Sequence, residues 1–264
     1  GVLRAHCERL ARTVDSDERR QRHNGKPLAC DPLNERNACG RRLEGKEWSS
    51  ARKHNESCFL CQLFGNTSLA SHFRIEDGYP KNPDAVRQEE RNGVAIDRVF
   101  GSVAVGPFNY ETVTAGEFQT SLHLKNFTLA QLGLLSLALR DLSAERVRIG
   151  FAKSRGLGVV TGKVTELTLR YPLCELDGEQ LRFLGGKALD KSKLYGVGAF
   201  VAENEGYGYP SSDEVALPPN YGYIADEWLG VEVRAPSRDD AGADWQPLGR
   251  ACVAQWKAVV EDGR

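Results

Sequence analysis

Residues 127–171 read FTLAQLGLLSLALRDLSAERVRIGFAKSRGLGVVTGKVTELTLRY, and this stretch decides the fold class. It begins with a T-x-x-Q capping box at Thr128 and Gln131, which is typical of the first turn of a helix. Leucines then recur at helical spacing as far as Leu142 and predict an apolar stripe. Residues 167–171 alternate apolar and polar side chains, so a strand is expected after the helix.

A loop that joins this helix to the strand interleaves basic side chains with glycines. It contains Arg146, Arg148, Lys153, Arg155, Gly150, Gly156, Gly158 and Gly162. A P-loop is excluded because no G-K-[ST] follows, and a dinucleotide fingerprint is excluded because the helix precedes the loop. Two interpretations remain open. The loop is either a glycine-rich turn with solvated charges, or a site where glycine backbone approaches phosphates that Lys153 and Arg155 neutralise.

The rest of the chain supplies the other elements of an α+β fold. Residues 2–14 carry apolar side chains at heptad-like spacing, residues 72–75 favour a strand, and residues 116–127 (GEFQTSLHLKNF) alternate most clearly. A polar segment from 15 to about 55 is too long for a plain connection, so we expect it to be either disordered or a loop held by another group. The order helix, strand pair, helix, glycine loop, strand predicts a ferredoxin-like (RRM-like) fold without its first strand.

Four of the seven cysteines form a candidate metal site. Cys58 and Cys61 form a C-x2-C pair, and Cys30 and Cys39 lie upstream in a loop rich in Gly, Pro and Asn. Two thiolates at this spacing can converge on one tetrahedral zinc ion, and a distant pair can complete the site. The alternative is that these cysteines are small buried hydrophobic residues. His23 and His54 are possible substitute ligands, although both are also typical surface histidines.

Composition and charge limit the class of protein. No apolar run approaches the ~18 residues of a membrane helix, and no secretory signal begins the chain, so a cytoplasmic protein is expected. The sequence contains no methionine and starts inside a helical pattern, so we expect a piece of a longer chain. Residues 201–264 hold 5 Lys and Arg against 12 Asp and Glu, a net of −7, which leaves +6 on residues 1–200. A basic body suits a polyanionic partner.

Motifs of hydrolases are absent from the sequence. There is no G-x-S-x-G or H-E-x-x-H, and no cysteine has an obvious histidine partner. Asp77 and Asp97 are conceivable catalytic carboxylates, but turn or salt-bridge roles account for them more simply.

Four motifs together resemble the RAMP superfamily (repeat-associated mysterious proteins). They are GVLRAHCERL, CFLCQLFGNTSLASHFRIED, NGVAIDRVFGSVAVGPFNYETVTAGEFQTSLHL and RIGFAKSRGLGVV, in family order. The chain is most similar to the backbone subunits of type III CRISPR effector complexes, and its cysteine block resembles that of zinc-bearing members, including fused multidomain effectors. The resemblance implies a ferredoxin-like domain over residues 1–172, with a zinc loop at about 15–62 and a β-hairpin thumb at about 76–116. Residues 173–264 match nothing in the family and are expected to be an acidic C-terminal extension or part of an adjacent domain.

The resemblance also implies partners and site residues. The partners are the guide RNA, a complementary target RNA and other effector subunits or fused RAMP domains, with no membrane. RNA-binding positions carried over from the motifs are Gly1, Arg4, Arg98, Gly150, Lys153, Ser154, Arg155, Gly156 and Gly158. A structural Zn²⁺ is expected on Cys30, Cys39, Cys58 and Cys61, and no residue is assigned a catalytic role.

Three functions stay open at this point. The first is an antiviral module that binds the guide RNA backbone and shapes the guide–target duplex. The second is an RNA-cleaving endoribonuclease, since some relatives cut target RNA with a loop aspartate and a metal ion. The third is a zinc-stabilised assembly module without direct RNA contact.

Overall fold

In the computed structural model, which describes residues 1–201, 205–238 and 242–261, the capping box begins helix α6 (Leu129–Ser143) as predicted. The Thr128 hydroxyl accepts a hydrogen bond from the Gln131 backbone, and the Gln131 side chain accepts one from the Thr128 backbone. These bonds satisfy two N–H groups that a helix start leaves without partners. Residues 129–136 of α6 are buried without interruption, so this part of the helix is covered on every side.

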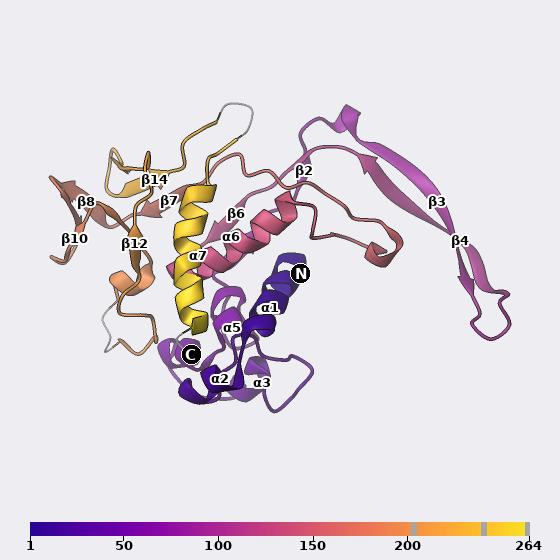
Figure 1. Ribbon diagram of the computed structural model, residues 1–264, viewed down its shortest axis with the longest axis horizontal. Coiled ribbons are helices and arrows are strands. Elements are labelled where there is room, and N and C mark those ends of the chain that lie inside the picture. The colour runs from indigo at the N-terminus through magenta and orange to yellow at the C-terminus, as the bar shows by residue number, and fades with distance from the viewer. Residues whose placement is uncertain (202–204, 239–241, 262–264) are drawn as a thin grey trace. The chain divides into compact units, whose positions relative to one another are not determined.

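Helix α7 (Gln246–Glu261) crosses α6, and small residues permit the close approach (Figure 1). A Cβ atom on Gly133 of α6 would lie 2.8 Å from the backbone nitrogen of Val253 in α7. A Cβ atom on Gly249 would lie 3.2 Å from the Ser136 side chain. Both distances are tighter than ordinary van der Waals contact, so larger residues would push the two helices apart.

Helix α1 (Val2–Val14) confirms the predicted first helix, and it contacts α6 and α5 (Phe59–Phe64). Cys7 is fully buried, as the heptad-like spacing predicts, whereas Val14 at the end of the helix is 43% exposed. Glu8 pairs with both Arg4 and Arg12 at i, i+4 spacing, so a row of alternating charges runs along the helix.

The prediction of one long loop from 15 to 55 is wrong. This segment contains helices α2 (Asp17–Arg22), α3 (Cys39–Leu43) and α4 (Ser50–Glu56). Ser16 and Ser49 cap α2 and α4, because each side chain accepts a hydrogen bond from a backbone N–H group in the first turn. These helices have five to seven residues, which is too short for a helical period to show in the sequence.

Strand β7 (Thr168–Tyr171) confirms the strand predicted after the glycine loop. Leu169 and Tyr171 are buried and Arg170 is exposed, as the alternation requires. Strand β7 pairs with β14 (Val231–Arg234), which pairs with β13 (Tyr223–Ala225). The remaining antiparallel strands after residue 173 are β8 (Cys174–Asp177), β9 (Gln180–Phe183), β10 (Ala188–Asp190), β11 (Lys193–Tyr195) and β12 (Glu214–Ala216).

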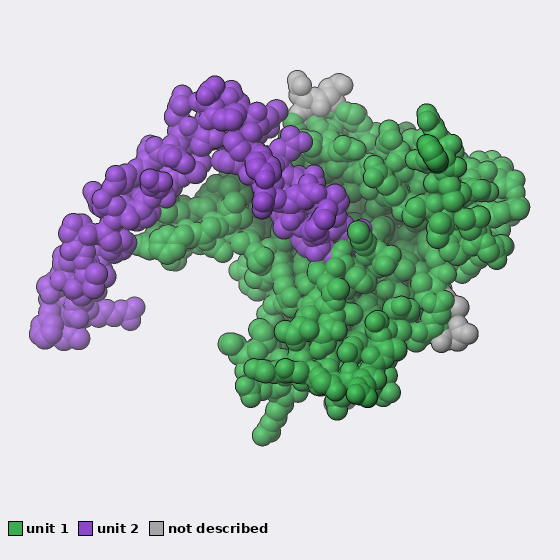
Figure 2. Space-filling view, turned by 180° about the vertical axis from the view of Figure 1, so that it is seen from behind, with its two compact units in different colours: residues 1–72, 125–264 green, residues 73–124 purple. Residues whose placement is uncertain are grey.

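The chain divides into two compact units, residues 1–72 with 125–264 and residues 73–124 (Figure 2). The described residues after 172 belong to the first unit, and the domain boundary expected there stays a prediction. The second unit contains the segment expected as the thumb. Its strands pair as β1 (Phe73–Ile75) with β6 (Leu122–Leu124), β2 (Tyr79–Pro80) with β5 (Phe118–Gln119), and β3 (Arg87–Ile96) with β4 (Val103–Ala115).

The single strand predicted over residues 116–127 is two short strands, β5 and β6. They pair with different partners, and between them the Thr120 hydroxyl donates to the Glu76 carbonyl. Among the described residues no sheet exceeds three strands, so the fold is mixed α/β with small antiparallel sheets and the ferredoxin-like palm stays a prediction. No described helix is both long and apolar enough to span a membrane.

Candidate functional site

The four cysteines grouped by their spacing lie together in the fold. Cys58 is the N-cap of α5 and Cys61 lies in its first turn, so the C-x2-C spacing places both at one end of this helix. Cys39 is the first residue of α3, and Cys30 precedes that helix. All four are buried, and their sulfur atoms lie within 4.8 Å of one another.

The spacing of the sulfur atoms fits a tetrahedral zinc ion. Zn–S bonds of about 2.3 Å place the corners of a thiolate tetrahedron about 3.8 Å apart. The sulfur atoms of Cys30 and Cys61 are 3.7 Å apart. Among the residues that the structure describes, no other group of three or more His, Cys, Asp or Glu side chains is arranged to hold a metal ion. The donor set is therefore that of a closed structural site.

Donors surround the sulfur atoms and favour thiolates. The backbone N–H of Cys58 lies 3.2 Å from the Cys39 sulfur, and the N–H groups of Cys30 and Cys61 each lie 3.4 Å from the Cys58 sulfur. The guanidinium of Arg4 is 3.7 Å from the Cys61 sulfur. These donors offset negative charge that four metal-bound thiolates would bring into the interior.

The pKa values differ within the cluster, since hydrogen bonds among the thiols and burial raise the pKa values of Cys58 and Cys61 above their ordinary values. Hydrogen bonds from neighbouring thiols, foremost that of Cys30, lower the pKa of Cys39 well below its ordinary value. By contrast, burial raises the pKa of Cys7 and of Cys252 to about 12, and that of Cys174 to about 11. These three isolated cysteines thus match the alternative of small buried hydrophobic residues.

The segment around the cluster is tied to the rest of the unit by polar contacts. The side chain of Asp15 is fully buried and accepts hydrogen bonds from Arg20 and from the Leu28 backbone. The Arg12 guanidinium donates to the Cys30 carbonyl at 2.7 Å. His54, considered as a substitute ligand, lies outside the cluster and contacts the Tyr207 carbonyl instead.

The glycine loop is closed by a bridge between Arg148 and Val159. At its far end a short 3-10 turn, η2 (Lys153–Arg155), exposes the side chains of Lys153, Ser154 and Arg155. The Arg148 guanidinium donates a hydrogen bond to the Lys153 carbonyl at 2.8 Å, and this bond stabilises the turn η2. The loop therefore presents a compact cationic tip.

The three loop glycines predicted to contact RNA have positive φ angles but different surroundings. Gly150 (φ +75°) and Gly156 (φ +91°) have open space where a Cβ atom would point. Gly158 (φ +80°) has none, because a Cβ atom would collide with the carbonyl oxygen of Ile149. Gly158 also accepts a hydrogen bond from the Ile149 backbone at 2.9 Å, so it keeps the two arms of the loop together.

The structure adds Phe151, which the sequence analysis did not single out. Its ring is 66% exposed, and the Arg155 guanidinium lies 5.2 Å from the ring centroid. An aromatic residue inside a basic, glycine-rich loop was a signal available in the sequence, since bases stack on such rings.

The other predicted RNA-binding positions lie elsewhere. Gly1 is exposed at the start of α1. Arg4 donates to the carbonyl oxygens of Phe64 and Gly65 at the end of α5, so its guanidinium also joins two helices. Arg98 is exposed in the turn between β3 and β4, within the 73–124 unit.

Asp97 organises the same turn. One carboxylate oxygen accepts hydrogen bonds from the backbone N–H groups of Val99 and Phe100, at 2.8 and 2.7 Å. Its own backbone N–H donates to the Ser102 carbonyl. This is the pattern of a turn-forming aspartate.

Comparison with known proteins agrees with these features. The RAMP superfamily model matches residues 1–161 of the 264-residue chain, from α1 through the cysteine cluster, the hairpin, α6 and the glycine loop. A search of curated proteins finds no match to the chain. Because the family model covers more than half of the sequence, the chain belongs to the RAMP superfamily.

Proposed function

We propose that this chain is a backbone module of a type III CRISPR effector complex and that it grips the phosphate backbone of the guide RNA. Its RAMP membership supports a CRISPR-associated RNA-binding role. The observation that carries the proposal is the glycine loop, where exposed Lys153 and Arg155 lie beside glycine backbone without side chains. Positive charge beside backbone that carries no side chain lets a phosphate approach closely.

Contacts of this kind do not read the sequence of the RNA. Lys153 and Arg155 neutralise phosphates, Ser154 can donate to a phosphate or a sugar, and Phe151 offers a face to any base. Indifference at the loop suits a guide whose sequence differs from one complex to the next, because the loop can then hold any of them.

We assign the hairpin β3–β4 as the thumb that shapes the guide–target duplex. At its tip Val99 and Phe100 are 82% and 83% exposed, next to the exposed Arg98. Isolated two-stranded hairpins are only marginally stable in water, and exposed apolar side chains mark contact surfaces. Apolar side chains at a hairpin tip can separate stacked bases, while Arg98 contacts the adjacent phosphate.

The remaining parts of the proposal concern stability and assembly. Zn²⁺ on the four cysteines would supply folding free energy and fix residues 15–62, and it would take no part in chemistry. Helices α1 and α6 would belong to the ferredoxin-like palm. The module would work in the cytoplasm with target RNA and with other effector subunits or fused RAMP domains.

The test is binding of the full chain to two fluorescent single-stranded RNAs of equal length and unrelated sequence over a range of KCl. Both RNAs should bind with about equal affinity, and log Kd should rise with log salt by roughly 0.7 for each phosphate contacted. Affinity that is confined to one sequence, or that ignores salt, would exclude a backbone grip. No detectable affinity for either RNA would favour the assembly module without RNA contact.

RNA cleavage is not assigned to this chain. The carboxylate of Asp97 is occupied by two backbone donors, which gives it a structural task in the turn. The check is incubation of guide and complementary RNA with the chain and Mg²⁺ or Mn²⁺. Regularly spaced products that disappear with Asp97→Ala would reverse this assignment.

A further inference from the structure

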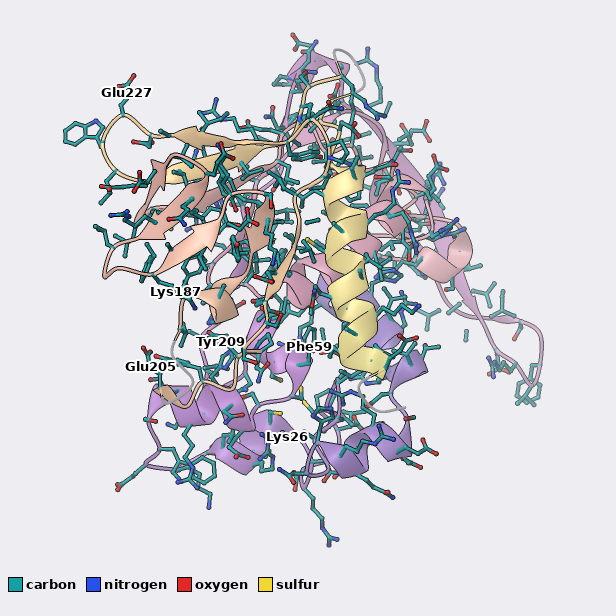
Figure 3. The ribbon with its side chains drawn as sticks, turned by 60° about the vertical axis from the view of Figure 1, so that its left-hand side comes forward. Lys26, Phe59, Lys187, Glu205, Tyr209 and Glu227 are labelled. Atoms are coloured by element: carbon teal, nitrogen blue, oxygen red, sulfur yellow. The ribbon has the colours of Figure 1, made fainter. Side chains whose placement is uncertain are left out.

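A cavity of about 460 Å³ is lined by helix α4 and by the segment that carries Glu205, Tyr207 and Tyr209. Figure 3 labels Glu205 and Tyr209 on this segment, beside the N-terminal helices. His72 and Asn126 also line the cavity, and its volume lies in the range of small-molecule sites. None of these residues belongs to the cysteine cluster or to the glycine loop.

Aromatic rings form much of the cavity wall. The rings of His54 and His72 are stacked, with centroids 5.6 Å apart and an interplanar angle of 18°. The rings of Tyr207 and Tyr209 are stacked as well, at 5.5 Å and 13°. Tyr209 lies 4.8 Å from His54, which joins the two pairs. Such a wall suits a flat aromatic ligand.

Backbone geometry holds the tyrosine segment against α4. Gly208 has a φ of +71°, and any side chain there would collide with the side chain of Asn55 in α4. Glycine adopts this positive φ without strain, and it leaves room for the Asn55 side chain between Tyr207 and Tyr209.

The side chain of His54 supplies a buried acceptor. His54 is 2% exposed, and burial lowers its pKa, so the ring is neutral at pH 7. Its Nδ1 lies 2.9 Å from the Tyr207 carbonyl, and a carbonyl can only accept, so Nδ1 carries the proton. The Nε2 atom is then an acceptor, and it is buried without a hydrogen-bond partner among the residues that the structure describes.

His72 repeats this arrangement. Burial lowers its pKa as well, and its ring hydrogen-bonds to the backbone of Asn126. The Nδ1 atom of His72 is buried and has no partner in the described part of the chain, so the bond to Asn126 uses Nε2 and leaves Nδ1 as the acceptor. With the carboxylate of Glu205, the cavity thus offers three acceptors. Tyr209, whose pKa burial raises to about 12, keeps its hydroxyl proton and can donate.

We propose that this cavity binds one unstacked guanine base of the RNA, an inference that rests on the RNA-binding function proposed above. The Watson–Crick edge of guanine presents adjacent N1–H and N2–H donors, which match the acceptors of His54, His72 and Glu205. Its O6 atom can accept from Tyr209. Adenine and cytosine offer a single amino group on that edge and uracil a single N–H, so each leaves buried acceptors unpaired.

The test uses the full chain and a short oligouridine RNA with one central guanosine, compared with the same RNA carrying inosine or adenosine there. Inosine lacks only the 2-amino group, and we expect it to weaken binding roughly tenfold because the charged acceptor Glu205 loses its partner. Glu205→Gln should reduce the difference between guanosine and inosine. The matched control is Glu227→Gln, the same change in the exposed turn between β13 and β14.

A second measurement tests whether a free nucleoside binds in the cavity when no RNA is present. Free guanosine at millimolar concentration should shift the side-chain ¹⁵N NMR signals of His54 and His72, and adenosine should not. Equal affinity for the three RNAs together with unmoved histidine signals would overturn the guanine pocket. Salt-dependent binding of plain oligouridine in that case would leave the backbone grip standing. Loss of oligouridine binding with intact guanosine shifts would instead overturn the backbone grip alone.

Discussion

The imidazole of His6 lies 2.9 Å from a carboxylate oxygen of Asp141, and this contact joins helices α1 and α6 across 135 residues of sequence. Both residues are buried, at 8% and 5% exposure. The other oxygen of Asp141 accepts hydrogen bonds from Arg140 and Arg146. The Asp141 carboxylate therefore forms hydrogen bonds with three side chains at the contact between α1 and α6.

Asp141→Asn should lower the free energy of unfolding by about 1–3 kcal/mol, because hydrogen bonds to a buried charge are lost. Chemical denaturation at pH 7 measures this change. Asp17→Asn is the control, since the Asp17 side chain is 89% exposed, and it should alter stability by no more than about 0.5 kcal/mol. Equal effects of the two substitutions would show that the contact of α1 with α6 does not depend on Asp141.

Acid should weaken the same contact. Burial would raise the pKa of Asp141, but hydrogen bonds from Arg140 and His6 outweigh burial and hold the pKa below its ordinary value. The stabilisation is thus complete above the unfolded pKa of about 4 and is lost as the pH falls through the folded pKa. The free energy of unfolding, measured from pH 6 to pH 3, should fall less steeply for Asp141→Asn than for the parent. Parallel curves would contradict this linkage.

Cys39→Ser should reduce the zinc content of purified, reduced protein from about one ion per chain to nearly none. It should also lower the melting temperature, because structural zinc contributes folding free energy directly. Cys174→Ser tests a buried cysteine outside the cluster and should retain the metal. Parent protein with far less than one zinc per chain would contradict the metal assignment.

Lys153→Ala combined with Arg155→Ala should weaken RNA binding about equally for unrelated sequences. The log–log salt slope should fall by roughly 1.4 in magnitude, since each lost phosphate contact removes about 0.7. Arg182→Ala with Lys191→Ala removes the same charge from residues that pair with Asp177 and Glu179. An identical slope change in this second pair would mean that net charge, and not the loop, governs affinity.

Gly158→Ala should impair RNA binding more than Gly156→Ala. At Gly158 the new Cβ atom collides with Ile149 and forces apart the arms of the loop. At Gly156 the space is open, so the cost is that of a positive φ alone, roughly 1 kcal/mol. Binding titrations of both variants at one salt concentration make the comparison. The reverse order would place the RNA against Gly156 and would make close approach to phosphate the dominant effect.

Local patterns were sufficient for some elements and insufficient for others. The capping box at Thr128 and the alternation at Leu169 were readable because the interactions lie within a few residues. The division of residues 116–127 into β5 and β6 was not readable, since it depends on partner strands far upstream along the chain.

The candidate sites differ in the same way. The cysteine cluster was predictable because C-x2-C spacing alone brings two thiols to one helix end. The cavity of His54, His72 and Tyr209 was not predictable, since its walls come from segments far apart in the sequence. The sequence around His54 indicates only a surface residue or a metal ligand, and the fold is needed to show this histidine against Tyr209.

The pairing of β1 with β6 allows the rest of the 73–124 unit to be exchanged or resized as one segment. Phe73 faces Leu124 in an antiparallel pair, so the first and last residues of the 73–124 unit lie next to each other. The length of the segment between β1 and β6 can therefore change without altering the distance between the two ends of the unit. Among proteins that share this arrangement, the reach of the hairpin can be lengthened or shortened by evolution or by design while the strand pair that anchors it is left intact.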